Sequence, residues 1–235
     1  ELNKVGAAVE DDGAKTDSLA AKAKSMIKAF VAAYAIKELV KLGKAALDAY
    51  AQFEQLEGGV NKIFGEDAAQ KVMKNAERAY QTAGISANKY MEQVTSFSAS
   101  LIQSLEGDTA KAADVADMAI QDMADNANTF GTSMESIQNA YQGFAKQNYT
   151  MLDNLKLGYG GTKEEMVRLL EEAEKISGIK YDISNLSDVY EAIHVIQTEL
   201  HVTGTTAKEA ASTIEGSMNM MKAAWENLLI AIGSG

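Results

Sequence analysis

Residues 108–131 have the sequence DTAKAADVADMAIQDMADNANTFG, and this stretch contains the pattern from which most of the chain is built. Asp108 is a residue type that favours the N-cap of a helix. Small and apolar residues then recur every three or four positions, at Ala112, Ala116, Ala119, Met123, Ala127 and Phe130. That spacing puts them on one face of a helix. Gly131 suits the left-handed conformation in which many helices end, so the stretch predicts one amphipathic helix.

The same order of cap, apolar stripe and glycine recurs after Gly59. Ser86 and Gly107 bound one stripe, and Thr162 and Gly178 bound another. Capping boxes are expected at Thr132 with Glu135, Thr162 with Glu165, and Thr206 with Glu209. The other stripes consist of Ala68, Val72, Ala76 and Tyr80; Tyr90, Val94, Phe97, Leu101 and Leu105; Ile137, Tyr141 and Phe144; Met166, Leu169, Leu170, Ala173 and Ile176; Leu186, Val189, Ile193, Ile196 and Leu200; and Ile214, Met218, Met221, Trp225, Leu228 and Ile232. We therefore expect an all-α fold, an array or bundle of about seven to eight amphipathic helices, one of them long and N-terminal.

The N-terminal part of the chain follows a different pattern. Residues 1–17 are polar and are expected to form a flexible lead-in. Residues 18–57 predict one long, lysine-rich apolar helix. Consecutive glycines at 58 and 59 are expected to end it, since glycine is a poor helix former. Residues 60–232 then predict a compact helical domain, with a boundary near the two glycines.

The segment from Lys22 to Lys44 combines six lysines, a single acid (Glu38) and an unbroken apolar run at residues 29–36. The run is far shorter than the ~20 residues that a helix needs to cross a bilayer. A lysine-flanked apolar helix can instead lie on an anionic membrane surface. It can also pack against copies of itself or against later helices. Contact between residues 18–57 and a membrane surface is therefore one of two expectations.

The overall composition narrows the classes of function. The chain has no proline, which favours uninterrupted helices, and no cysteine, which excludes disulfides and thiolate metal sites. Its formal net charge of −11 argues against specific nucleic-acid binding, because phosphate contacts need basic patches. The sequence starts at Glu1 without a methionine, so we expect a piece of a longer protein.

One pair of residues has the spacing of a metal-binding motif. Glu191 and His194 form the Glu-x-x-His unit found in di-iron helical bundles. That chemistry requires two such units and two further glutamates, whereas this chain has one unit and only two histidines, His194 and His201. We therefore expect no metal site and no cofactor.

Two other features invite a functional interpretation. The loop at residues 158–163, GYGGTK, precedes a helix as a phosphate-binding loop does, but it lacks the spacing and the preceding strand of a P-loop. We expect a mobile connector that leaves Tyr159 available as an exposed contact residue. Met218, Met220 and Met221 suit an adaptable binding surface. Two of the three lie on the predicted inward stripe with Trp225, which favours packing in the core.

Catalytic arrangements are not recognisable in the sequence. It contains no cysteine nucleophile, no Gly-x-Ser-x-Gly and no histidine placed beside a plausible serine and acid motif. We assign no catalytic, cofactor-binding or metal-binding residue and expect a protein that is not an enzyme.

Several long blocks resemble the tape measure proteins of long, non-contractile tails in phages and prophages of Gram-positive bacteria. The resemblance extends over about three quarters of the chain, from Phe53 to Leu229. The most specific block is AYQGFAKQNYTMLDNLKLGYGGT at residues 140–162. The others are QLEGGV (55–60), YQTAGISAN (80–88), TSFSASLIQSL (95–105), TIEGSM (213–218) and MKAAW (221–225).

The resemblance implies a structural virion component that is made in the host cytoplasm and lies in the lumen of the tail tube. It further implies a protein that sets tail length during assembly and is ejected at infection to assist genome delivery. The implied partners are the tail tube protein, tail assembly chaperones, distal tail or baseplate proteins, and further copies of the same chain. The family has no catalytic residues to carry over.

Two alternatives from other classes stay open. The first is a membrane-active helical protein, similar to a pore-forming toxin subunit, for which leakage of liposomes by residues 18–57 would be the diagnostic observation. The second is a tail-associated enzyme such as a cell-wall hydrolase, which a peptidoglycan assay would detect.

Overall fold

The computed structural model describes residues 36–210 and 214–234, and within these ranges the chain is all-helical without a strand. The predicted fold class is confirmed, with eight α-helices and one short 3₁₀ helix in the described ranges. The helices are α3 (Ile36–Thr82), α4 (Ala87–Ser104), α5 (Thr109–Phe130), α6 (Met134–Phe144), the 3₁₀ helix η1 (Leu152–Leu155), α7 (Lys163–Ser177), α8 (Leu186–Glu199), α9 (Thr205–Ala210) and α10 (Ile214–Gly233). The predicted lead-in at 1–17 and the first part of the long helix, residues 18–35, lie outside the described residues.

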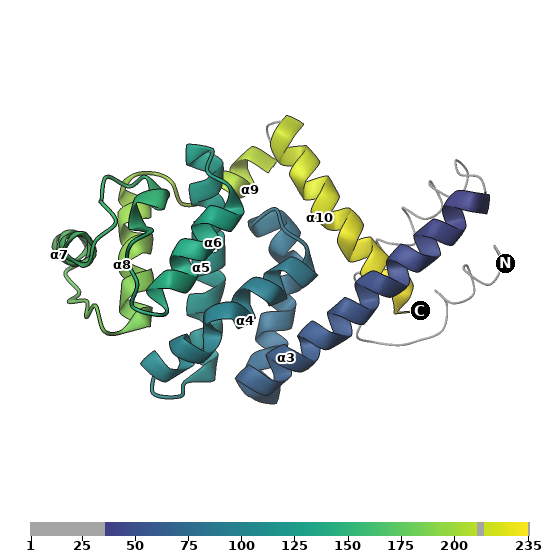
Figure 1. Ribbon diagram of the computed structural model, residues 1–235, viewed down its shortest axis with the longest axis horizontal. Coiled ribbons are helices and arrows are strands. Elements are labelled where there is room, and N and C mark those ends of the chain that lie inside the picture. Colours follow the sequence, from purple (N-terminus) through teal and green to yellow (C-terminus); the bar gives the residue numbers. More distant parts are fainter. Residues whose placement is uncertain (1–35, 211–213, 235) are drawn as a thin grey trace.

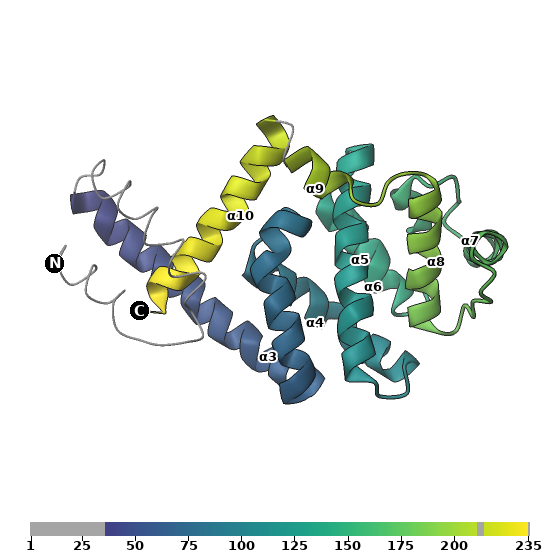
Figure 2. The ribbon, with the colours of Figure 1, turned by 180° about the vertical axis from the view of Figure 1, so that it is seen from behind.

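The helices form an elongated molecule with α5 at its centre (Figure 1). Helix α5 packs against α3, α4, α6, α8 and α9. Helix α7 packs on α8 at one end of the molecule, whereas α10 crosses the first half of α3 at the other end (Figure 2). At this crossing the backbones approach closely, since a Cβ on Gly233 would lie 2.2 Å from the carbonyl oxygen of Ala46.

The long helix does not end where the sequence predicted. Helix α3 continues through Gly58 and Gly59, so the expected end of the helix at these glycines is wrong. A glycine inside a helix costs only about 1 kcal/mol relative to alanine, and the adjacent Val60 is fully buried in the core. Packing therefore outweighs propensity here. The break comes at Gly65 (φ 75°, ψ 167°), where the chain turns a corner between two helical halves. The division into domains near residue 59 stays a prediction.

Most of the predicted helix ends are confirmed. Ser86, Asp108 and Thr162 act as N-caps, each accepting a hydrogen bond from the backbone N–H three residues later. Gly131 and Gly178 adopt the left-handed conformation at the ends of α5 and α7.

Two predicted helix starts need correction. The cap of α6 is Ser133, not Thr132, because the Ser133 hydroxyl accepts from the Ser136 N–H. The last predicted helix, which was expected to start at a capping box of Thr206 and Glu209, is two helices, α9 and α10. The residues between them, 211–213, lie outside the described ranges.

The buried core follows the predicted stripes over most of their length. An aromatic cluster joins three helices, with Tyr190 of α8 lying 5.5 Å from Phe97 of α4 and 5.0 Å from Tyr141 of α6, measured between ring centroids. Ile176 (48%) and Leu200 (50%) were predicted to face inward and are exposed instead. Both stand at the C-terminal end of their helix. A periodic pattern identifies the face of a helix but not where the neighbouring helix ceases to cover it.

The two central tyrosines provide a matched test of buried hydroxyl groups. The Tyr190 hydroxyl donates to the Tyr141 carbonyl oxygen at 2.9 Å, whereas the equally buried Tyr141 hydroxyl has no partner in the described part of the chain. Tyr190→Phe should lower the free energy of unfolding by about 1 kcal/mol, because it removes a satisfied hydrogen bond. Tyr141→Phe should be neutral or stabilising in urea titrations, because it removes an unpaired polar group. Equal losses in the two variants would contradict this assignment.

Candidate functional site

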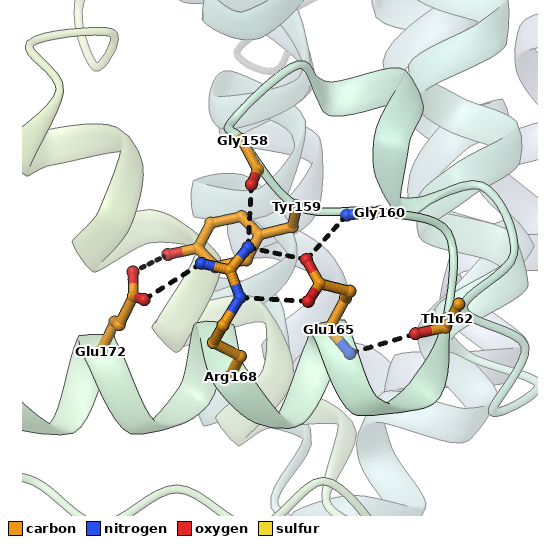
Figure 3. Close-up of polar contacts among 7 residues, drawn as sticks. All are labelled: Gly158, Tyr159, Gly160, Thr162, Glu165, Arg168 and Glu172. Carbon is orange, nitrogen blue, oxygen red and sulfur yellow. Dashed lines mark hydrogen bonds and ion pairs between the residues drawn. The ribbon is translucent and has the colours of Figure 1, made fainter.

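The loop before α7 is fastened by the side chain of Arg168 (Figure 3). The guanidinium group donates to both carboxylate oxygens of Glu165, at 3.1 and 2.6 Å, and to Glu172 at 3.2 Å. It also donates to the carbonyl oxygen of Gly158 at 2.9 Å and lies 4.4 Å from the centre of the Tyr159 ring. One side chain on α7 therefore holds the preceding loop by charge, hydrogen bonding and cation–π contact together.

Tyr159 is covered by this arrangement. Its side chain is only 7% exposed, and its hydroxyl donates to Glu172. The expectation that Tyr159 is an exposed contact residue is therefore wrong. The only sequence signal for this cluster was the spacing of charges. Glu165, Arg168 and Glu172 stand three and four residues apart, which places them on one face of a helix.

A backbone donor that a phosphate could use is already taken by the protein itself. The N–H of Gly160 donates to the carboxylate of Glu165 at 2.9 Å, so an acidic side chain of the protein occupies the position of an anion. The hydrogen bonds from Arg168 and Gly160 lower the pKa of Glu165 to about 2. Burial, followed by the hydrogen bond to Glu172, raises the pKa of Tyr159. Both groups therefore keep one protonation state near neutral pH, which suits a structural clasp rather than proton transfer.

Gly161 allows this loop to pass close to the preceding segment. A Cβ at residue 161 would lie 2.3 Å from the carbonyl oxygen of Thr150, which is backbone and has little room to move. At the adjacent Gly160 a Cβ would meet only the flexible Glu165 side chain, at 3.5 Å.

These two glycines form a matched pair for mutation. Gly161→Ala should lower the free energy of unfolding by at least about 2 kcal/mol, because the added methyl group overlaps backbone. Gly160→Ala should cost well under about 1 kcal/mol, because its new contact has an ordinary distance. Chemical denaturation measures both, and equal stabilities would show that the close approach at Gly161 is not required.

A second polar cluster lies inside the molecule on α5. Asp122 is 1% exposed, and its carboxylate accepts from Nδ1 of His194 at 2.9 Å. His194 belongs to the Glu-x-x-His unit, but the Glu191 carboxylate is turned to the Ser187 hydroxyl. The structure therefore does not bring the two residues together as ligands. In the described ranges no three acidic, histidine or cysteine residues lie close enough to hold a metal.

The next turn of α5 fixes the end of α8 and the start of α9. Asp125 accepts from the backbone N–H groups of Gly204 at 2.6 Å and Thr206 at 2.8 Å. The Asn126 amide donates to Leu155 of η1 and to Gln197 of α8. Sequence reasoning missed this cluster, because Ala119, Met123 and Ala127 accounted for the stripe on their own. The available signal was that Asp122 and Asn126 continue the spacing from Ala119.

Both members of the buried pair hold a proton more strongly than usual. Burial raises the pKa of Asp122 to about 6, although the hydrogen bond from His194 opposes this rise. The hydrogen bond to Asp122 raises the pKa of His194, against the effect of desolvation. The folded state therefore binds protons more tightly than the unfolded chain at both sites.

This pair should make stability depend on pH. Because both folded pKa values lie above their unfolded values, the stabilisation is present in acid and is lost as the pH rises through the folded values. Between about pH 5 and pH 8, the stability of the wild type should fall by about 1–2 kcal/mol relative to Asp122→Asn/His194→Gln, which cannot titrate there. Urea denaturation at several pH values measures this difference. A difference that is constant or rises with pH would contradict the assignment.

An open cleft of about 920 Å³ lies between α10 and the central helices. Its lining includes the caps Ser86 and Ser133, the unpaired hydroxyl groups of Thr132 and Thr206, and charges of both signs. The charged residues are Lys89, Glu92, Glu209, Lys222 and Glu226. The mixture of signs gives the cleft no clear preference for an anion or a cation.

The methionine stripe on α10 does not lie in the core as predicted. Met218 is 47% exposed and Met221 is 63% exposed, whereas Trp225 is half-buried. The stripe turns inward only farther along α10, at Leu228 (5% exposed). Most of the lysine-rich segment from Lys22 to Lys44 lies outside the described residues. Among the described helices, none is long and apolar enough to span a bilayer.

Comparison with known proteins identifies no relative: no protein-family model, no curated protein and no solved structure matches this chain.

Proposed function

We propose that this chain is a structural, non-enzymatic segment of the tail tape measure protein of a long-tailed phage or prophage. The observation that carries the proposal is the sequence resemblance, above all the block at residues 140–162. In the fold this block is one continuous unit that runs from α6 through η1 to the loop clasped by Arg168. Because these residues build one structural unit, there is a physical reason for the block to be retained as a whole.

The chemistry of the two polar clusters supports a structural role. The guanidinium of Arg168 donates hydrogen bonds to Glu165, Glu172 and Gly158. Asp122 and Asp125 are likewise engaged by His194 and by the start of α9. In the described ranges, the other ring nitrogen of His194 has no hydroxyl partner that would complete a nucleophile relay. Both clusters hold helices and loops in place.

In this role the protein lies in the lumen of the tail tube. Its proposed partners are the tube protein, the assembly chaperones, the distal tail or baseplate proteins and further copies of itself. Residues 18–57 are the proposed point of contact with the host membrane during genome delivery. The compact fold is the form of the free chain, and an extended helical form is proposed within the tail.

An in-frame deletion in the parent gene tests the role as a ruler. Removing residues 60–230 takes out about 170 residues, which would span about 260 Å as one helix at 1.5 Å per residue. Tails measured by electron microscopy should be shorter by that amount. A smaller deletion, residues 87–130, should shorten them by about 65 Å, in proportion to its length. Tails of normal length that fail to infect would overturn the ruler and favour a compact domain at the tail tip.

A further inference from the structure

The corner in α3 is made by one residue. Gly65 alone departs from helical geometry between Ile36 and Thr82, with φ 75° and ψ 167°. A Cβ at this position would have no atom within 4 Å, so packing does not require a glycine there. The backbone conformation does, because side chains other than hydrogen are strongly disfavoured in this region. A change of two torsion angles at Gly65 would join the two halves into a single helix.

The first half of α3, residues 36–64, is held by contacts across the corner. The Ala49 carbonyl oxygen accepts from the Asn88 side chain of α4 at 3.0 Å. Helix α10 crosses at Ala46, which is buried, and Val60 and Phe64 lie in the core. If α3 straightened in an isolated molecule, these contacts would break and the apolar residues would meet water. That loss keeps the corner closed in the monomer.

A second copy of the chain can restore every one of these contacts. When α3 straightens in both copies, the surface of α4 and α10 in each copy is left uncovered. The first half of α3 from the other copy can then pack against it. The contacts that re-form are the same ones, so the exchange changes little except the conformation at Gly65. Reciprocal exchange of identical elements is a low-cost route to dimers.

We propose that two copies of this chain exchange residues 36–64 by straightening α3 at Gly65. The resulting continuous helix, Ile36–Thr82, has 47 residues, a length of about 70 Å. Each first half packs against α4 and α10 of the other copy, in the position that it holds within one copy in Figure 1. The exchange needs only the chain itself and is independent of the proposed role in a tail.

Substitution at the corner tests the proposal on the full chain. Gly65→Ala penalises the bent conformation and favours the helix, which should shift each corner toward the straight form by about 30-fold or more. Two corners change per dimer, so the association constant should rise by about 1,000-fold. Gly58→Ala is the matched control, since Gly58 is exposed, helical and equally free of contacts.

Light scattering after refolding at several protein concentrations measures whether each variant is monomeric or dimeric. Gly65→Ala should be mainly dimeric at concentrations where the wild type and Gly58→Ala are monomeric. A Gly65→Ala protein that is folded and monomeric overturns the proposal. So does one that is unfolded at every concentration, because exchange predicts that helicity returns as the concentration rises.

Crosslinking of introduced cysteines with a flexible bis-maleimide separates exchange from ordinary association, because the chain has no native cysteine. In Ala49→Cys/Asn88→Cys the reagent should join the two cysteines within one chain in the monomer and between chains in the exchanged dimer. In Lys71→Cys/Asp114→Cys, which replaces an ion pair between the second half of α3 and α5, it should join them within one chain in both forms. With Gly65 unchanged, the 49–88 crosslink should become increasingly interchain as the refolding concentration rises. Dimers whose 49–88 crosslinks stay within one chain overturn the exchange.

Discussion

Burial of carboxylates on the central helix is the constraint on which the arrangement of the other helices depends. The first part of α5 is lined by alanines, which let α3 and α4 approach closely, whereas its last turns bury Asp122, Asp125 and Asn126. A buried charge without a partner costs several kcal/mol, so donors have to be brought to these side chains. Helix α8 supplies His194 as the donor to Asp122 and Gln197 as an acceptor for Asn126, and the backbone N–H groups of Gly204 and Thr206 at the start of α9 donate to Asp125. Helix α9 in turn packs against α10.

The second polar cluster works differently because it lies at the surface. Arg168, Glu165 and Glu172 are partly exposed, so their ion pairs contribute little to stability individually. Their value lies in geometry, since the guanidinium reaches two carboxylates, a backbone carbonyl and an aromatic ring at once. This arrangement keeps an irregular segment closed over Tyr159 without a helix or strand to order it.

A compact fold and a role as a length ruler make opposite demands on the chain. The absence of proline suits an extended helical form, because no residue of the chain interrupts a helix by lacking a backbone N–H. The network around α5 suits a closed form, because opening it would expose Asp122 and Asp125 together with the apolar core. Gly65 bears on both demands, because the backbone conformation of this one residue decides whether α3 turns a corner or continues as a straight helix.

The sequence by itself determined the helical class and most of the helix ends. Caps such as Asp108 and stops such as Gly131 act through hydrogen bonds to their own helix, and the apolar stripes follow from 3.6 residues per turn. The tertiary structure decided what depends on neighbours far along the chain. Burial of Val60 lets the helix continue through Gly58 and Gly59. His194, 72 residues along the chain from Asp122, hydrogen-bonds to it, and Arg168 covers the ring of Tyr159. Local patterns report one face of one helix, whereas these contacts depend on which other helix that face meets.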